Sequence, residues 1–266
     1  MDFGLRDRVA LVTGASGGIG AAIARALASE GARVAVGYHS RRVAANRLVA
    51  DIEGAGGAAV PVAHDLRDPS SIQAGVDATV QTWGRLDVLV TSAWVHPAWP
   101  EQPQTRGPRE SADFVGWESG PSSPEVWREQ LRINTEGTAH AVRAALPHMK
   151  GQGWGRIVFI SSGAAEEGQP GLEAYAAAKA ALHGFARSLA RGLGRDGILA
   201  NVVMPGFIAT ERNRREVPAA VLEQWASMTP TGRLATEKDV ARVVTFLASD
   251  ANGSATGCAL RVSGGL

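Results

Sequence analysis

Seven short apolar runs, separated by Ala-rich segments of helical periodicity, constrain the fold of this chain more than any other feature. Most of the runs are apolar throughout rather than alternating, which is typical of strands covered on both faces. The expected strands are 8–14, 33–38, 58–66, 86–93, 155–162, 198–206 and 259–265. Repeated strand–helix alternation indicates βαβ units. The sequence therefore predicts an α/β fold, a doubly wound parallel seven-stranded sheet with helices on both faces.

One segment interrupts this alternation. Residues 94–127 contain four of the seven tryptophans and six of the thirteen prolines, a composition that disfavours helix and strand. Long loops in compact domains are usually functional or disordered, and the tryptophans argue against plain disorder. With no linker and no repeat, we expect one domain over residues 1–266, with an insertion at about 95–125 and a helical lid at about 207–230.

Composition limits the classes of function. Lys and Arg total 27 and Asp and Glu total 26, a net charge of +1, which argues against nucleic acid as a partner. The single cysteine, Cys258, excludes an internal disulfide and is typical of a reducing compartment. No apolar run approaches the roughly 18 residues of a membrane span. The first expected strand begins near Arg8, which leaves no room for a signal peptide. We therefore expect a cytoplasmic protein with no membrane partner.

A glycine-rich turn follows the first expected strand. In TGASGGIG, at 13–20, Gly14, Gly18 and Gly20 are spaced for a tight turn into a helix. Glycine lets the backbone approach a ligand closely, and the N–H groups at a helix N-terminus attract phosphate. A purely structural turn is the alternative. The strand before it and the helix after it favour a Rossmann-type dinucleotide site.

The end of the second expected strand bears on the choice of cofactor. Dinucleotide folds that use NAD usually carry Asp or Glu there to bind the ribose 2′-hydroxyl. Here the residues are Tyr38, His39, Ser40, Arg41 and Arg42. No carboxylate would repel a 2′-phosphate, and arginine pairs well with one, so NADP(H) is favoured over NAD(H). The alternative is that both arginines open a solvated helix.

The third expected strand ends at Asp65 and Leu66, where an adenine edge can be held. Asp is also a common residue in turns, so a capping role for Asp65 is the alternative.

Tyr175 and Lys179 lie four residues apart in AYAAAKAAL and share one face of a helix. A phenol has a pKa of about 10, and a nearby ammonium lowers it, so this tyrosine can exchange a proton with a substrate. Ser162, at the end of an expected strand, can brace a carbonyl oxygen as charge develops on it. The alternative is a core-facing tyrosine beside a snorkelling lysine, since Leu182 and Phe185 continue the same stripe.

Taken together, the motifs resemble the short-chain dehydrogenases/reductases, most closely the 3-oxoacyl-carrier-protein reductase branch. The matching pieces are TGASGGIG at 13–20, Asn134 in RINTEGTAH, Ser162 in ISSG, YAAAK at 175–179, PGFIAT at 205–210 and the C-terminal GRLATEKDVARVVTFLASD and ALRVSGG. The match covers nearly the whole chain except about 95–125.

The resemblance implies roles for individual residues. Tyr175 would be the general acid/base, and Lys179 would lower its pKa and hold the nicotinamide ribose. Ser162 would orient the substrate carbonyl, and Asn134 would hold a water in a proton relay to Lys179. Thr210 would touch the nicotinamide carboxamide.

The implied cofactor-binding residues are Gly14, Ser16, Gly18, Ile19, Gly20, Tyr38, His39, Ser40, Arg41, Asp65, Leu66, Ala93, Tyr175, Lys179, Pro205, Gly206, Ile208 and Thr210. The expected substrate contacts are Trp94, Ser162 and Phe207. We assign no metal ligands.

Two departures from the family pattern concern these sites. The fourth expected strand ends in TSAW instead of the usual NNAG, so Trp94 replaces a glycine close to the nicotinamide. The phosphate turn of NADP-dependent members often contains a basic residue where this chain has Gly17, which weighs against NADP.

We therefore expect an NADPH-dependent reductase that converts a ketone to a secondary alcohol. A 3-oxoacyl, polyketide-type or bulky cyclic substrate is consistent with the motifs. Oxidation of a secondary alcohol is the runner-up, and a catalytically silent nucleotide-binding regulator is a third reading. The insertion either walls the substrate pocket or packs outside it or at a subunit interface.

The resemblance also bears on partners. It implies a homotetramer that uses the helix of 124–150, the Tyr175 helix and the C-terminal strand as interfaces. Lys150 and Arg191 fall near positions where carrier-protein reductases dock their acidic partner. Three further arginines either meet an anionic substrate or form a solvated helix face. They are Arg212, Arg214 and Arg215.

Overall fold

The sheet forms as the sequence predicts. The computed structural model describes residues 2–94, 122–168 and 171–266. Within them, seven strands pair in parallel in the order β3-β2-β1-β4-β5-β6-β7. The strands are β1 (Val9–Thr13), β2 (Arg33–Tyr38), β3 (Ala58–Ala63), β4 (Val88–Thr91), β5 (Gly155–Ile160), β6 (Ile198–Pro205) and β7 (Ala259–Val262). Several end before the predicted boundary because the last residues of each run leave the ladder and form the loops at the carboxyl edge of the sheet.

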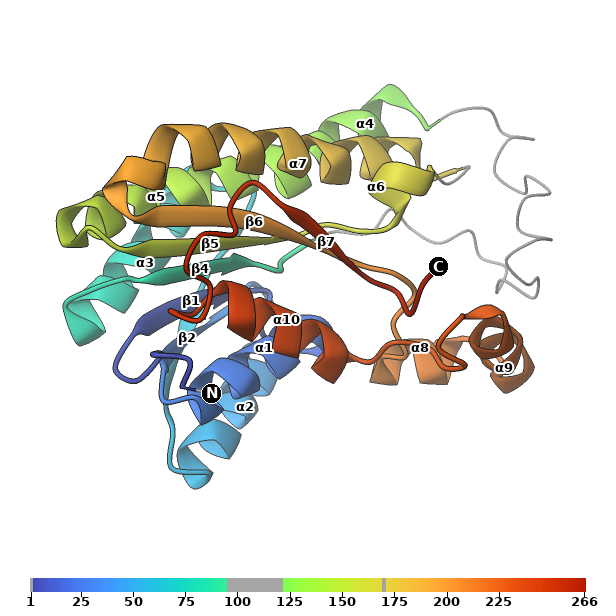
Figure 1. Ribbon diagram of the computed structural model, residues 1–266, viewed down its shortest axis with the longest axis horizontal. Coiled ribbons are helices and arrows are strands. Elements are labelled where there is room, and N and C mark those ends of the chain that lie inside the picture. The colour runs from blue at the N-terminus through green and yellow to red at the C-terminus, as the bar shows by residue number, and fades with distance from the viewer. Residues whose placement is uncertain (1, 95–121, 169–170) are drawn as a thin grey trace.

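Helices cover both faces of this sheet (Figure 1). One face carries α1 (Gly18–Ser29), α2 (Arg42–Gly54) and α10 (Glu237–Leu247), and the other carries α3 (Pro69–Trp83), α5 (Thr138–Gln152) and α7 (Glu173–Leu193). The remaining helical elements are α4 (Pro124–Leu131), η1 (Arg132–Gly137), α6 (Ala164–Glu167), η2 (Gly194–Asp196), α8 (Glu211–Glu216) and α9 (Ala219–Met228). None of the helices in the described part of the chain is long and apolar enough to cross a membrane.

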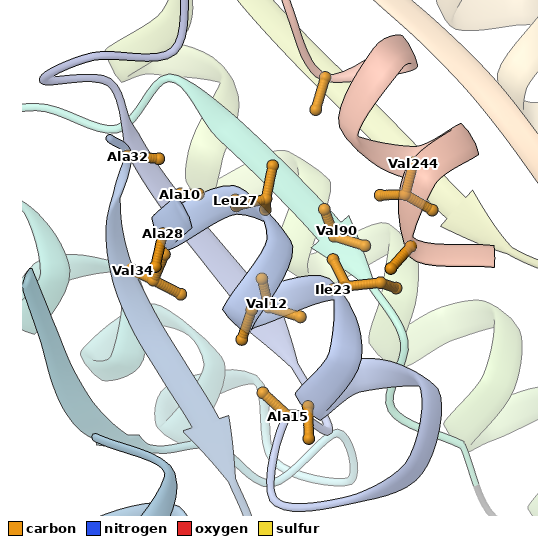
Figure 2. Packing of buried hydrophobic residues seen from close by; sticks show 14 of the residues in the cluster. Ala10, Val12, Ala15, Ile23, Leu27, Ala28, Ala32, Val34, Val90 and Val244 are labelled. Atoms are coloured by element: carbon orange, nitrogen blue, oxygen red, sulfur yellow. The ribbon is translucent and has the colours of Figure 1, made fainter. Parts of the chain in front are cut away.

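The apolar runs are continuous because alternate side chains enter two different cores. In β1, Ala10 and Val12 pack against α1, whereas Val9 and Leu11 face the helices on the opposite side. Figure 2 shows Val12 beside Ile23 and Leu27 of α1. Each large aliphatic side chain buried in this way contributes about 1.5–3 kcal/mol.

Charged side chains tie the amino ends of the strands together. Asp87 is fully buried, accepts a hydrogen bond from the backbone N–H of Val9 (2.8 Å) and pairs with Arg8 and Arg85. The guanidinium groups of Arg8 and Arg156 lie 3.8 and 4.2 Å from the ring centroid of Trp154. The buried carboxylate of Asp87 is therefore compensated by arginines and by a backbone N–H.

A helical run from 124 to 152 contains an irregular turn. Ser123 caps its start by accepting a hydrogen bond from the N–H of Val126 (3.4 Å). Residues Arg132–Gly137 then form a π-helical segment between α4 and α5, and Asn134 lies inside it. The sequence predicts this helix but not the π segment, a feature often found at functional sites.

Candidate active site

The glycine-rich turn forms between β1 and α1. Gly14 has φ +66°, and a Cβ there would lie 2.6 Å from Ala93 Cα. A Cβ on Gly20 would lie 2.5 Å from the carbonyl oxygen of Gly14. No side chain caps the start of α1. An uncapped helix N-terminus behind a bare glycine turn fits the phosphates of a dinucleotide.

Arg41 reaches this turn from the start of α2. Its Nη1 lies 2.9 Å from the position that a Cβ on Gly17 would occupy. Ser16, Gly17, Gly18 and Arg41 line the mouth of an open groove of about 940 Å³ that continues along α1. NADP-dependent relatives are expected to carry a basic residue at the position of Gly17. Here the guanidinium of Arg41 lies at that position instead.

The ends of β2 and β3 meet beside the turn. His39 Nε2 lies 3.3 Å from Asp65 Oδ2, and Asp65 Oδ1 accepts a hydrogen bond from the N–H of Arg67 (3.0 Å). Burial acts to raise the pKa of Asp65, but the bond from Arg67 and the charges of His39 and Arg67 outweigh it and lower that pKa. Asp65 thus stays ionised and structures its own turn, with Leu66 buried next to it.

Tyr175 and Ser162 are brought together at the carboxyl edge of β5. Ser162 follows the strand, and Tyr175 lies in the first turn of α7, where it is 9% exposed. Burial raises the pKa of Tyr175 to about 12, and a hydrogen bond with Ser162 opposes part of that shift. The two hydroxyls can therefore contact one carbonyl oxygen.

Lys179 lies one helical turn further along α7 and is 3% exposed. Its Nζ donates a hydrogen bond to the carbonyl oxygen of Ile160 (3.0 Å) and lies 5.8 Å from the ring centroid of Tyr175. Burial lowers the pKa of Lys179 to about 7. Desolvation of the buried phenol is the largest influence on the pKa of Tyr175 in this structure. The role of Lys179 in lowering that pKa stays a prediction.

Asn134 lies on the π segment and is 1% exposed. Its Nδ2 donates to Gln130 Oε1 (2.8 Å), and the neighbouring Thr135 Oγ1 donates to the carbonyl of Ala178 (3.2 Å). The bond from Thr135 holds the π segment against α7 at the residue before Lys179. The role of Asn134 in a proton relay stays a prediction.

Trp94 follows β4 and faces the tyrosine. The two ring centroids are 5.8 Å apart, and 42% of Trp94 is exposed. Ala93 is fixed just before it, since its N–H donates to Thr13 Oγ1 (3.0 Å). The expected insertion at 95–125 lies outside the described residues except for 122–125.

The loop after β6 is held by its neighbours. The N–H of Gly206, after Pro205, donates to Val262 O (3.0 Å), and Ile208 bridges to Ala235. Thr210 caps α8 by accepting from the N–H of Asn213 (3.1 Å).

Phe207 packs edge-on against Trp225 of α9, with 4.0 Å between ring centroids. This contact joins the loop that follows β6 to α9 within the segment 207–230.

Three of the basic residues considered above as partner or substrate contacts are paired within the chain: Lys150, Arg212 and Arg215. Lys150 Nζ lies 3.1 Å from Asp196 Oδ2. Arg212 and Arg215 pair with Glu216 of their own helix, at 2.7 and 3.2 Å. The solvated-face reading of α8 is therefore favoured over an anionic subsite.

Three contacts near Tyr175 could not be predicted from the sequence. Glu173 accepts hydrogen bonds from Ser122 Oγ (2.9 Å) and from the N–H of Gly171 (2.8 Å), which ties two loops to the start of α7. Ser161 Oγ contacts His183 Nε2 at 2.9 Å. The only signal for them was the position of Glu173 and His183 on the Tyr175 helix.

The chain matches known proteins over nearly its whole length. The family model described as enoyl-(acyl carrier protein) reductase matches residues 14–266. A cis-4-hydroxycyclohexanecarboxylate dehydrogenase of Sinomonas cyclohexanicum is 36% identical over 259 residues, covering 97% of this chain and 96% of the relative. A 3-oxoacyl-[acyl-carrier-protein] reductase of Haemophilus influenzae is 35% identical over 265 residues, covering 98% and 99%.

A solved structure shows the same fold. The gluconate 5-dehydrogenase of Burkholderia cenocepacia, in complex with NADP and tartrate, superimposes with a TM-score of 0.84 at 30% identity, covering 100% of this chain and 97% of that one. The chain belongs to the short-chain dehydrogenase/reductase family, whose members here are NAD(P)-dependent oxidoreductases that act on secondary alcohols or ketones.

Proposed function

We propose that the protein is an NADPH-dependent carbonyl reductase that converts a ketone to a secondary alcohol. The observation that carries this proposal is the hydrogen-bonded pair Ser162–Tyr175 at the carboxyl edge of β5, beside the buried Lys179. Ligands bind at this edge in doubly wound sheets. A core-facing tyrosine with a snorkelling lysine does not match this arrangement, because Lys179 is turned inward onto the end of β5 instead of toward solvent.

The residues present fit a dinucleotide. The bare turn at Gly14–Gly20 and the uncapped start of α1 would hold the pyrophosphate, and Arg41 would pair with a 2′-phosphate. When bound, the reduced cofactor supplies the hydride that the carbonyl carbon receives. NADP(H) is preferred over NAD(H) in this proposal, since no carboxylate follows β2 and the solved relative above binds NADP.

The proton comes from Tyr175. With its pKa raised to about 12, the phenol is protonated at neutral pH and has a proton to give to a carbonyl oxygen. Ser162 donates a second hydrogen bond to that oxygen and stabilises the charge that develops on it. Lys179, together with a water held by Asn134, would return a proton from solvent to Tyr175.

The substrate class follows from the wall beside Tyr175. The half-exposed Trp94 ring presents an apolar face next to the expected carbonyl position. Aromatic rings bury large apolar areas in a ligand pocket, so we propose a bulky, cyclic or polyketide-type ketone. The cyclohexane ring in the name of one relative is consistent with this class. A 3-oxoacyl substrate on a carrier protein is the second candidate, supported by the reductase of Haemophilus influenzae.

A panel of ketones tests the proposal. NADPH oxidation is followed by absorbance with cyclic ketones and with free and carrier-bound 3-oxoacyl substrates, and secondary alcohols with NADP⁺ test the reverse direction. The matched control is Tyr175→Phe, which keeps the ring. General acid catalysis contributes about 10²–10⁴-fold, so the variant should lose at least that much turnover with cofactor binding retained. Ketone-independent NADPH binding alone would favour the regulator reading, and near wild-type turnover of Tyr175→Phe would exclude the mechanism.

We also expect the protein to be cytoplasmic and to assemble as a homotetramer through the helical run of 124–150, α7 and β7. The segment 207–230 would act as the lid over the substrate in this single-domain protein. Size-exclusion chromatography with light scattering tests the assembly.

A further inference from the structure

A buried histidine lies one helical turn after Lys179. His183 is 8% exposed, and its Nε2 lies 2.9 Å from Ser161 Oγ. Ser161 is the residue immediately before Ser162, and its backbone N–H donates to Val203 O (2.8 Å). His183 is thus linked to Ser162 through one hydrogen bond and one peptide bond. It plays no part in the chemistry described above.

The hydroxyl of Ser161 bridges two partners. Its Oγ donates to the carbonyl oxygen of Lys179 (3.0 Å). A hydroxyl has one hydrogen, so once that hydrogen is given to Lys179, the contact with His183 requires Nε2–H to donate to Ser161 Oγ. The geometry therefore assigns the Nε2–H tautomer to His183.

Lys179 is consequently held at both of its ends. Its ammonium donates to Ile160 O at the end of β5, and its backbone carbonyl accepts from Ser161 on the same strand end. His183 completes this link from the next turn of α7. The strand end that carries Ser162 and the helix that carries Tyr175 are joined by three hydrogen bonds within one turn.

We propose that His183 is a positioning residue, which holds Ser161 and thereby sets the position of Ser162 relative to Tyr175. Buried hydrogen bonds contribute to a defined geometry when every member is satisfied. A hydroxyl on the proposed reacting oxygen must be placed to within a fraction of an ångström to stabilise the developing charge. Glu166 of α6 and Arg187 of α7 are the charged groups near the imidazole, and their effects on its pKa oppose each other.

Two substitutions at position 183 separate the hydrogen bond from packing. His183→Leu fills the site without a donor, and His183→Gln keeps a donor at a distance from the backbone similar to that of Nε2. Losing one such bond corresponds to a roughly threefold to tenfold lower kcat. We expect that loss of kcat in His183→Leu and a kcat within about twofold of wild type in His183→Gln. The dissociation constant of NADPH should change little in either variant, because the bond acts on Ser162 and not on the phosphate turn. Thr245→Val on α10, which removes a buried hydroxyl far from α7, is the matched control.

The kcat measurement rests on the proposed carbonyl reduction, so hydrogen exchange gives a readout that does not. Deuterium uptake by peptides covering 160–163 should rise about twofold or more in His183→Leu but not in His183→Gln or Thr245→Val. A protein inactive on all ketones that shows this pattern would leave the link intact and reject only the proposed function.

Other outcomes would overturn the proposal. These are unchanged kcat and exchange in a folded His183→Leu, or equal losses in His183→Leu and His183→Gln. If His183→Leu does not fold, Ser161→Ala removes the bond to His183 together with the bond to the carbonyl of Lys179. The proposal then requires the threefold to tenfold loss of kcat in Ser161→Ala, and wild-type kcat would reject it.

Discussion

The indole ring of Trp94 lies against the phenol ring of Tyr175, with 5.8 Å between centroids and 55° between planes. Trp94 stands where relatives are expected to carry glycine, in the loop after β4, and keeps 42% of its surface exposed. A tilted aromatic pair of this kind is favourable, so the ring has a defined place beside the expected carbonyl. One part of the indole ring therefore lies against Tyr175, and the exposed part offers an apolar surface that a substrate approaching Tyr175 would contact.

Replacing this ring should change substrate preference. Trp94→Gly restores the family residue and removes the apolar wall, so small ketones should gain relative to bulky cyclic ones. We expect the ratio of kcat/KM between the two classes to shift by at least about 1 kcal/mol, or roughly fivefold, the lower end of what a methylene contributes in a pocket. An unchanged ratio in a folded variant would show that Trp94 does not face the substrate.

Arg41 should decide between the two cofactors. Arg41→Ala removes the guanidinium at Gly17, so NADPH should bind at least about tenfold more weakly, because a hydrogen bond to a charged group contributes about 1.5–3 kcal/mol. NADH, which lacks the 2′-phosphate, should bind as before. Arg47→Ala, on the same groove but further along α2, is the control. A wild-type protein that prefers NADH would contradict the assignment.

The parts of this protein that could be predicted from sequence depend on short-range pattern. The continuous apolar runs gave all seven strands, and the placement of Tyr175 and Lys179 on one helical face followed from their spacing. The bare turn at Gly14 was likewise visible in its glycines. In each case the neighbouring residues alone determine the local geometry.

The remaining features depend on contacts between distant segments. Nothing near Gly17 shows that Arg41 supplies its missing positive charge, and nothing near Trp94 shows that it meets Tyr175. The sign of the pKa shift of Tyr175 could not be predicted either. The spacing of Tyr175 and Lys179 puts an ammonium near the phenol. Burial, which only the fold reveals, is the largest influence on the pKa of Tyr175.

The buried ammonium of Lys179 should lower the free energy of unfolding. Its folded pKa of about 7 lies below the unfolded value of 10.5. Between these values the unfolded state binds more protons, so the free energy of unfolding rises with pH from about 7 to 10.5, and the full penalty is present below pH 7. Lys179→Met removes the buried charge and should raise Tm at pH 6, by an amount that shrinks toward pH 10, while abolishing turnover. A methionine variant less stable than wild type at pH 6 would show that the bond to Ile160 outweighs desolvation.

His64 makes stability depend on pH in the same direction as Lys179, but in the acid range. Its side chain is 4% exposed, its ring nitrogens have no hydrogen-bond partner among the described residues, and burial lowers its pKa from 6.5 to about 4. The neutral form is the one that fits, so its contribution to stability is complete above pH 6.5 and is lost as the pH falls from 6.5 toward 4. The loss amounts to about 3 kcal/mol if the full shift is expressed.

His64→Leu should remove most of that loss. Leucine has a similar volume and no group to protonate, so the fall in Tm between pH 7.5 and pH 5 should be smaller in the variant than in wild type. At pH 7.5 the two should differ little, since the imidazole makes no hydrogen bond to the described residues that leucine would break. His140→Leu, an exposed histidine on α5, should keep the wild-type pH dependence. If His64→Leu also keeps it, the acid sensitivity belongs to other groups, and the buried imidazole is not the one that resists protonation.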